Sequence, residues 1–397
     1  MIVFEGETLQ LAGADVAYLQ HVLGGRLRAR PSGWAISRVV GHLAMPSGET
    51  LRVRSPKAPA AAVLAWIAYA DPTFRSLQLV GEVDDGAAPD DLAALAARLF
   101  TRALLLAAAR HGLTRRYLRQ QVRSATVRGA IDFAALVRQG GDIALTPCIV
   151  WQRLPDTPLN RLLAAALARV QRDALMRAAC RRDLAQASAL LAGVRPAIDG
   201  ALLSGKRQLG RTERPYAALL SLARLIVAHS GLGDGATSAG PAFIVDLEAL
   251  FERTVVRGLR EAGIRGRAKA PVLYLRLGDD GQPAASGAME MDFFAFDVGG
   301  EPLVVDAKYK RDVSSANLQQ MVTYCFVSGA RRAVLVLPAG HLADRRDYRF
   351  VAHAASDAVQ VHLVELATSA TNSREWRDSS GSMASAVLRT CERSRTR

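Results

Sequence analysis

The residues with the clearest chemical potential are an acid and a lysine two positions apart. In the run Val304-Val305-Asp306-Ala307-Lys308-Tyr309-Lys310, an apolar segment ends in one carboxylate and two ammonium groups. Alternate side chains of a strand share a face, so Asp306 and Lys308 are expected to point the same way, about 7 Å apart along the backbone. They would place an acid beside a compact cation at the rim of a sheet.

A second acid lies on the preceding apolar segment. Asp292 comes fourteen residues before Asp306, and the segment 297–301 between them has the composition of a hairpin turn. If the two strands pair symmetrically about Gly299, Asp292 and Asp306 lie opposite each other at one end of the ribbon. Both carboxylates could then hold one divalent cation, with the Ala307 carbonyl as a third ligand, because hard cations prefer oxygen.

Such a group suits the hydrolysis of phosphodiester bonds. A divalent cation polarises the phosphate and lowers the pKa of a bound water molecule. The chain has 51 lysines and arginines, of which five are lysines, at positions 57, 206, 269, 308 and 310. Lysine can change its protonation state and arginine cannot, so Lys308 is predicted to act at the attacking water or the phosphate, and Lys310 to contact phosphate. The alternative is a surface hairpin with an exposed Asp–Lys pair.

Three polar residues on predicted helices are candidates for the same site. Gln320 and Tyr324 are four positions apart, so both could face the phosphate; the alternative is a solvated helix face. Glu252 is a candidate metal ligand, and its alternative is a surface ion pair with Arg253 or Arg257.

The composition favours a polyanionic partner. The formal net charge of +14 suits nucleic acid or an anionic membrane surface, with codon bias toward arginine as the alternative explanation. The four cysteines lack the spacing of a zinc site and fit a reducing compartment. The N-terminus has no signal-peptide pattern, and the most apolar stretch, 103–109, is shorter than the ~20 residues of a membrane span. These features predict a cytoplasmic protein with no membrane partner.

The order of elements predicts a multi-domain α/β protein. Residues 1–60 read as a β-rich module, residues 61–240 as mainly helical, and the glycine-rich run 231–240 as a boundary. From 241 to 366 we expect a helix at 243–262, strands at 272–277, 291–297 and 302–307, a helix at 315–327, and strands at 333–337 and 359–364. Residues 367–397 are poor in large apolar side chains and are expected to form a disordered tail.

The chain resembles McrC, the nuclease subunit of the McrBC modification-dependent restriction system, within the PD-(D/E)xK nuclease superfamily. The most specific match is the run 306–310 with the following Gln320 and Tyr324. Weaker matches span about residues 41 to 337 and lie at 45–48, 51–57, 128–133, 156–163 and 250–252. Where the superfamily has a proline before its first acid, this chain has Met291.

The resemblance assigns roles to individual residues. The acids of the motif would be Asp292 and Asp306 and its lysine Lys308, in a C-terminal nuclease domain at 241–366 with a mixed sheet flanked by helices. The cofactor would be Mg²⁺, for which Mn²⁺ can substitute, and the substrate double-stranded DNA. The partner would be a McrB-like AAA+ GTPase ring, with residues 1–60 as the docking module. The chain would then be the endonuclease subunit of a GTP-dependent complex in anti-phage defence, and would stimulate its partner's GTPase.

Two other functions fit parts of the pattern. A non-catalytic nucleic-acid-binding or GTPase-activating adaptor could retain the nuclease fold, although intact Asp292, Asp306 and Lys308 favour an enzyme. An RNA nuclease would use the same site. The run 200–206, GALLSGK, resembles a phosphate-binding loop, but Arg207 follows where that motif has Ser or Thr, and no apolar strand precedes it. We therefore expect no nucleotide site in this chain.

Overall fold

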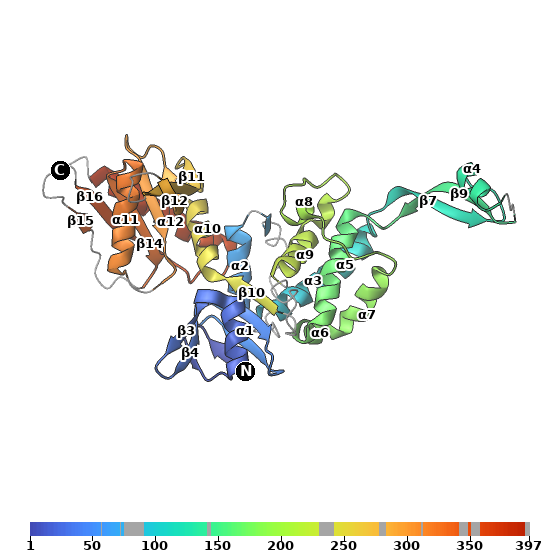
Figure 1. The fold of residues 1–397 in the computed structure, drawn as a ribbon, viewed down its shortest axis with the longest axis horizontal. Helices are drawn as coiled ribbons and strands as arrows, with labels where there is room; N and C mark the ends of the chain where they lie inside the picture. Colours follow the sequence, from blue (N-terminus) through green and yellow to red (C-terminus); the bar gives the residue numbers. More distant parts are fainter. Residues whose placement is uncertain are drawn as a thin grey trace. The chain divides into compact units, whose positions relative to one another are not determined.

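The chain forms two compact units, each described here by itself (Figure 1). The computed structural model describes residues 1–56, 58–71, 73–74, 91–140, 144–229, 242–277, 283–310, 313–340, 348–350 and 358–393. Of these, 1–74, 91–92 and 242–393 belong to the first unit, and 93–229 to the second. The first unit therefore combines both ends of the chain, and it contains every candidate site residue. The predicted mixed α/β class is confirmed. The predicted glycine-rich boundary at 231–240 lies outside the described residues.

The N-terminal part of the first unit contains two small sheets. Strands β1, β6, β5 and β10 form one sheet in that order, and β2, β4 and β3 form the other. Helix α1, which was not predicted, packs into the same apolar core through Leu19 and Leu23. No side chain caps its start at Gly13, so the sequence carries no helix-start signal there. The bounds are β1 Ile2–Phe4, β2 Thr8–Leu9, α1 Gly13–Leu23, β3 Leu27–Arg30, β4 Gly33–Ile36, β5 Val39–Ala44, β6 Thr50–Arg54 and β10 Ala242–Asp246.

Strand β10 joins the two ends of the chain. It pairs antiparallel with β5, with Phe243 opposite His42. The predicted helix at 243–262 is therefore wrong in its first turn, because the β-branched and aromatic run before Asp246 completes a sheet. Asp246 then starts α10, Leu247–Glu261, by accepting hydrogen bonds from the Glu248 and Ala249 amides at 3.0 and 3.1 Å.

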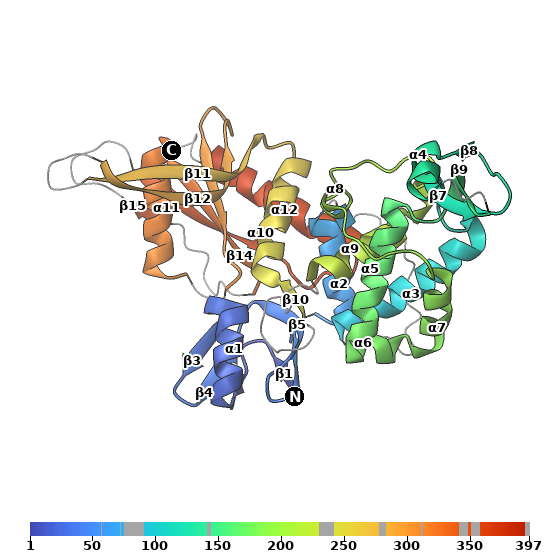
Figure 2. The same ribbon diagram turned by 45° about the vertical axis from the view of Figure 1, so that its right-hand side comes forward.

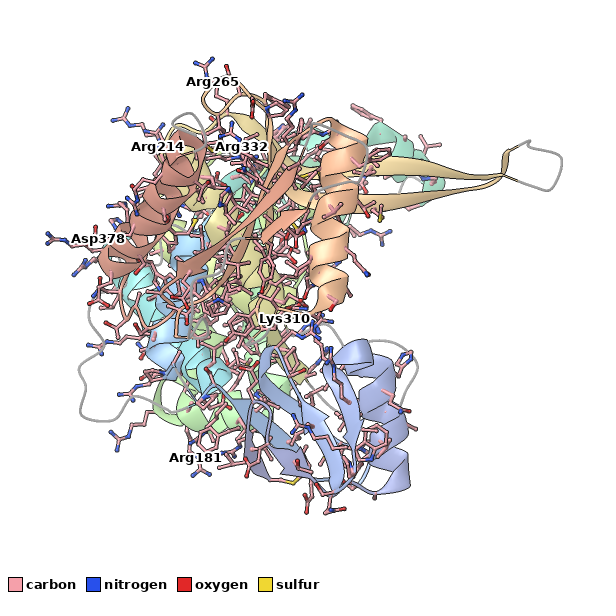
Figure 3. All side chains as sticks on the ribbon, turned by 90° about the vertical axis from the view of Figure 1, so that its left-hand side faces the viewer. Arg181, Arg214, Arg265, Lys310, Arg332 and Asp378 are labelled. Atoms are coloured by element: carbon pink, nitrogen blue, oxygen red, sulfur yellow. The ribbon has the colours of Figure 1, made fainter. Side chains whose placement is uncertain are left out.

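The C-terminal part of the first unit is a six-stranded mixed sheet in the order β11-β12-β13-β14-β16-β15. Strands β11 to β13 pair antiparallel, and β13, β14 and β16 run parallel. Figure 2 shows β11 and β12 as a long hairpin, and Figure 3 shows the sheet between α11 and α12. Helix α10 contacts β12 and β13. The bounds are β11 Gly266–Leu277, β12 Pro283–Ala295, β13 Leu303–Ala307, α11 Ser315–Ser328, β14 Arg332–Pro338, β15 Tyr348–Phe350, β16 Val359–Leu366 and α12 Ser373–Arg393.

The expected disordered tail at 367–397 is wrong for residues 373–393, which form α12. Trp376 is 1% exposed and stacks on Trp66 of α2, Ala60–Ala70, with 4.7 Å between ring centroids. The apolar side chains of α12 are few, but they recur at helical spacing and are buried: Trp376, Met383, Val387 and Cys391. Helix α2, expected within the helical middle region, packs on α10 and α12 and belongs to the first unit.

The second unit is mainly helical and carries a three-stranded sheet in the order β7-β9-β8, which was not predicted. In Figure 1 the β7–β9 ribbon leads away from α5 to α4. Helix α3 is long and apolar enough to cross a membrane by length and composition, and half of its apolar window is buried in the structure. The bounds are α3 Leu92–His111, β7 Arg116–Ser124, β8 Ala130–Ile131, α4 Phe133–Arg138, β9 Thr146–Leu154, α5 Pro158–Arg172, α6 Ala174–Ala179, α7 Arg181–Leu190, α8 Gly200–Leu203 and α9 Ala217–His229.

Candidate functional site

The register of the β12–β13 hairpin brings the two predicted acids together. Phe293 lies opposite Val305, and continuing this pairing by one residue puts Asp292 opposite Asp306, as the predicted symmetry about the turn requires. Both acids are buried, at 5% and 1% exposed. The backbone amide of Ala307 donates to Asp292 Oδ2 at 2.9 Å, which anchors this carboxylate to the end of β13.

Lys308 lies on the same side of the strand end as Asp306, as the alternation predicts. Its Nζ is 2.8 Å from Asp306 Oδ2. That oxygen is buried, and the Lys308 ammonium is in close contact with it, outside the angles of a regular hydrogen bond. Burial raises the pKa of Asp306 to about 6, and the charge of Asp292 adds to this effect while Lys308 opposes it. Burial lowers the pKa of Lys308, but the charges of Asp306 and Asp292 outweigh it and raise that pKa above its usual value.

Lys269 of β11 completes the group, and sequence reasoning gave it no role. Its Nζ is 2.6 Å from Glu252 Oε2, 3.0 Å from Asp292 Oδ1 and 3.5 Å from Glu290 Oε1. The available signal was the scarcity of lysine: three of the chain's five lysines, at 269, 308 and 310, belong to this part of the structure.

Glu252 faces the acids of the sheet. The alternative of a surface pair with Arg253 or Arg257 is wrong, since Arg253 pairs with Asp71 at 3.2 Å and Arg257 with Glu261 at 2.8 Å. Burial and the charge of Asp292 raise the pKa of Glu252, against the lowering effect of Lys269. Glu252 therefore lies within the electrostatic field of Asp292, but its nearest cation is the Lys269 ammonium.

Gln320 and Tyr324 lie on one face of α11, as predicted, but their hydrogen bonds indicate a supporting role. Gln320 Nε2 donates to the Tyr324 hydroxyl at 2.7 Å, and that hydroxyl donates to the Glu290 carbonyl at 2.8 Å. Tyr324 is 1% exposed. The hydroxyl proton of Tyr324 is therefore used in the hydrogen bond to the Glu290 carbonyl of β12. The structure gives no support for the expected phosphate contact through Tyr324.

A basic cleft adjoins the ion pair. Its volume is about 640 Å³, and Lys308 and Lys310 line it together with three arginines of the N-terminal module, Arg28, Arg30 and Arg38. Figure 3 labels Lys310 where the C-terminal sheet faces this module. Two carboxylates, Glu5 and Glu248, also line the cleft, and Glu248 accepts hydrogen bonds from Arg38 at 2.8 Å. Five cations thus face two acids, which leaves a surface suited to polyanions. Burial, Lys308 and Arg38 lower the pKa of Lys310.

The two buried acids of the sheet are the candidate ligands for a divalent cation. Among the described residues, no group of three or more acidic, histidine or cysteine side chains is arranged by itself to hold a metal ion. Asp306, however, has a buried oxygen without a hydrogen bond, beside a second buried carboxylate that raises its pKa. A hard cation bound to Asp292 and Asp306 would relieve this repulsion. The Ala307 carbonyl remains a predicted third ligand, and Glu252 is already held by Lys269 at 2.6 Å.

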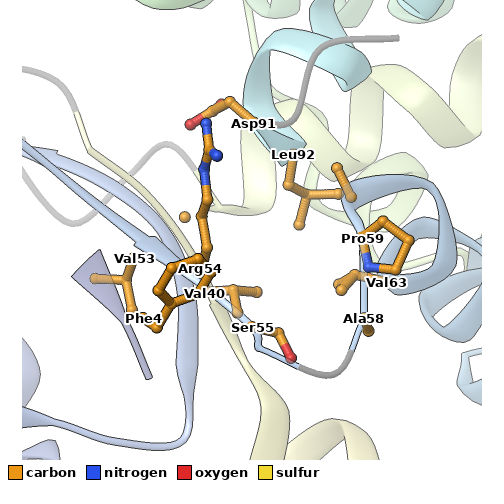
Figure 4. Close-up of a pocket in the computed structure, with 12 residues that line it drawn as sticks. Phe4, Val40, Val53, Arg54, Ser55, Ala58, Pro59, Val63, Asp91 and Leu92 are labelled. Atoms are coloured by element: carbon orange, nitrogen blue, oxygen red, sulfur yellow. The ribbon is translucent and has the colours of Figure 1, made fainter. Parts of the chain in front are cut away.

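A second hollow in the first unit offers no comparable chemistry. It encloses about 200 Å³ and shares no lining residue with the basic cleft. In Figure 4 most of the residues that line it are apolar, and the Arg54 side chain points toward Asp91. One acid facing one arginine leaves no excess charge for a metal ion or a phosphate.

The remaining sequence motifs have structural explanations. Gly129 has φ +72°, and a Cβ there would lie 2.4 Å from the Ile149 carbonyl oxygen. Asn160 Nδ2 donates to the carbonyls of Thr114 and Pro155 at 2.8 and 2.6 Å, which fixes the start of α5. The run resembling a phosphate-binding loop forms the short helix α8, capped by Asp199, and Arg207 pairs with Glu213 at 2.7 Å.

Comparisons with known proteins identify the family and a similar fold. The model of a family described as McrBC 5-methylcytosine restriction system component matches residues 35–338. Among curated proteins, none matches this chain. The fold is similar to a chain in a refined half-complex from the tetradecameric assembly of Thermococcus gammatolerans McrB AAA+ hexamers with bound McrC, with a TM-score of 0.58 and 17% identity over 96% of this chain and 98% of that chain. A chain in a cryo-EM structure of the Thermococcus gammatolerans McrBC complex matches with a TM-score of 0.46 and 17% identity, over 68% of this chain and 89% of that chain.

Proposed function

This chain belongs to the family of McrBC 5-methylcytosine restriction system components, and from this premise we propose that it is the Mg²⁺-dependent DNA endonuclease of such a system. Its substrate would be double-stranded DNA, and its partner a McrB-like AAA+ GTPase ring whose GTP hydrolysis it stimulates. The proposal rests on one observation above all: buried Asp292 and Asp306 meet at a strand end with the Lys308 ammonium 2.8 Å from the second acid.

Each of these residues has a task in phosphodiester hydrolysis. Asp292 and Asp306 would hold Mg²⁺, which when bound polarises the phosphate and acidifies a water molecule. Lys308 would bind the scissile phosphate or orient the attacking water, and its contact with Asp306 sets its position. Gln320 and Tyr324 would hold β12 in place through the Glu290 carbonyl. The site would therefore be assembled before the substrate arrives, as electrostatic catalysis requires.

The basic cleft supports a nucleic-acid substrate. Phosphates of a strand lying in it would meet Lys310 and the arginines of the N-terminal module, and would lead to Lys308 at the reacting end. The module was expected to dock on the partner ring, but Arg28, Arg30 and Arg38 line this cleft. We therefore assign these arginines to the DNA backbone.

The β7–β9 ribbon of the second unit is a better candidate for the ring contact. Together with α4 it exposes large apolar side chains, each more than half exposed: Tyr117, Val127, Phe133, Val137, Leu145 and Trp151. Such side chains on a projecting ribbon favour a protein partner. The similar fold in the McrB–McrC assembly makes an AAA+ ring the partner we propose.

Cleavage and GTP hydrolysis measured in one sample test the proposal. The full chain, mixed with a McrB-like GTPase, GTP, Mg²⁺ and plasmid DNA containing 5-methylcytosine, should cut the plasmid. Asp306→Asn should reduce cutting by at least about 100-fold and leave the stimulated GTP hydrolysis unchanged. Asp297→Asn, an exposed acid of the same hairpin, should retain both activities.

Other outcomes separate the alternatives. If the wild-type chain stimulates GTP hydrolysis but cuts neither DNA nor RNA, it is an adaptor with a nuclease-like fold. If it cuts RNA and leaves DNA intact, the site is assigned correctly and the substrate is wrong.

A further inference from the structure

Lys269 has a backbone conformation that its side-chain type does not explain. It lies in strand β11 with a φ of +51°, in the left-handed region that ordinary residues avoid. The pairs Ala268–Phe293 and Ala270–Met291 on either side place Lys269 in the same row as Asp292. Local strain of this kind persists where the surrounding structure demands a particular side-chain position.

This backbone conformation places the Lys269 ammonium among carboxylates. The Lys269 Nζ lies within 3.5 Å of one oxygen from each of three carboxylates, those of Glu252, Glu290 and Asp292. The carboxylates come from different elements, α10 and β12, so no single turn or helix holds them together. Asp292 is also one of the two proposed metal ligands. These three carboxylates are also groups that could hold a second divalent cation in a two-metal nuclease.

The charges lead to the same conclusion. Glu252, Glu290, Asp292 and Asp306 carry four negative charges, and Lys269 with Lys308 carries two positive ones. A single divalent cation neutralises the remaining two negative charges. A second divalent cation would add two more positive charges to a partly buried group.

We propose that Lys269 is a built-in replacement for the second metal ion, so that this site binds one divalent cation. Lysine suits the role because its ammonium is compact and can accept several oxygen neighbours, whereas the planar guanidinium of arginine cannot fit among three separate carboxylates in the same way. The side chain is 50% exposed, so its replacement removes little packing.

Calorimetric titration of the full chain with Mn²⁺, without DNA, tests the inference. The wild-type chain should bind one Mn²⁺. Lys269→Met, which keeps the length and removes the charge, should bind two, and the additional Glu252→Gln substitution should restore one. Lys269→Gly provides a second route to the same result, because glycine accepts a φ of +51° without strain. Lys206→Met, an exposed lysine of the second unit, is the matched control and should bind one.

The inference rests on the proposed metal site, and the titration distinguishes the two. If wild-type protein binds no Mn²⁺, the proposed metal site itself is wrong. If wild type binds one and both Lys269 variants, folded by circular dichroism, also bind one, the metal site stands and the role of Lys269 is overturned.

Discussion

The Lys308 ammonium lies 2.8 Å from the buried Asp306 carboxylate, and only 20% of the lysine side chain is exposed. Lys308→Arg should lower the cleavage rate by about 100-fold, because a guanidinium is wider and does not release a proton. Lys310→Arg is the matched control, and its effect should be far smaller since a phosphate contact needs the charge alone. Cleavage rates under single-turnover conditions would measure both, and equal rates for Lys308→Arg and wild type would contradict the assignment.

Asp306 should make the stability of the metal-free protein depend on pH. Its folded-state pKa of about 6 lies above the ordinary value of 3.8, so the folded state holds this proton more tightly. The free energy of unfolding, relative to Asp306→Asn, should therefore be highest below pH 4 and fall as pH rises through about 6. The total loss should be about 3 kcal/mol. Urea unfolding with a chelator at pH 4, 5, 6 and 7 measures this difference, and a difference that does not change with pH would show that Asp306 is not held in a protonated state by burial.

The site residues whose positions could be predicted from the sequence are those placed by the geometry of one strand or one hairpin. Asp306 and Lys308 follow from strand alternation, and Asp292 follows from the symmetry of a tight hairpin. Lys269 could not be found in this way, because its position depends on the pairing of β11 with β12 and on a φ of +51°. Tyr324 was placed on the correct helix face, but its hydrogen bond to the Glu290 carbonyl depends on how α11 packs on the sheet.

At the scale of elements, α12 connects to the end of β13 through a row of aromatic rings. Trp376 stacks on Trp66, and Trp66 in turn contacts Tyr309, with 4.7 and 6.0 Å between ring centroids. Tyr309 directly follows Lys308, so this row of aromatic rings connects the C-terminal helix to the proposed catalytic lysine. The indole nitrogen of Trp66 also donates to Thr254 of α10 at 2.7 Å, which joins a third helix to the group.

Trp376→Ala should therefore destabilise the protein by about 3–5 kcal/mol, the usual cost of removing a fully buried aromatic side chain. Trp151→Ala, in which an indole that is 67% exposed is removed from β9, is the control and should change stability by less than about 0.5 kcal/mol. Denaturant unfolding measures both variants. Equal stability of Trp376→Ala and wild type would mean that α12 is not part of the core.

The elements that the sequence missed were those with weak local signals. Helix α12 has a low apolar content, and its burial comes from side chains spaced along one face. Helix α10 follows strand β10 directly, so the sequence pattern reads as one helix. The end of the strand at Asp246 can be recognised only from the pairing of β10 with β5. Strand β7 of the ribbon has polar side chains on both faces. It therefore lacks the alternation of apolar and polar residues that indicates a half-buried strand.

At the scale of the whole molecule, the proposed tasks fall on different units. The acids and the basic cleft belong to the first unit, and the exposed apolar ribbon belongs to the second. The sequence analysis did not anticipate that both ends of the chain share one unit, in which β10 continues the N-terminal sheet. The two ends of the chain form one unit through contacts between residues about 200 positions apart, which no local pattern reveals.

This division predicts a variant that separates the two activities. Phe133→Asp with Val137→Asp, on exposed positions of α4, should reduce stimulation of the partner's GTP hydrolysis by at least about tenfold, because apolar contacts at the centre of an interface are lost. Mn²⁺ binding to the same variant should equal that of wild type. Phe326→Asp, at a position on α11 of the first unit that is still more exposed, is the control for stimulation. Full stimulation by the α4 variant would place the ring contact elsewhere.

The central claim is that one catalytic cation lies between Asp292 and Asp306, and iron-directed cleavage of the protein backbone tests it most directly. Fe²⁺ bound in place of Mg²⁺ generates hydroxyl radicals with ascorbate and peroxide, and these cut the chain next to the metal. Mass spectrometry of the fragments should show cuts around residues 292 and 306 that disappear with excess Mg²⁺ and in Asp306→Asn. Cuts confined to other parts of the chain, or cuts at 292 and 306 that persist in Asp306→Asn, would contradict the account.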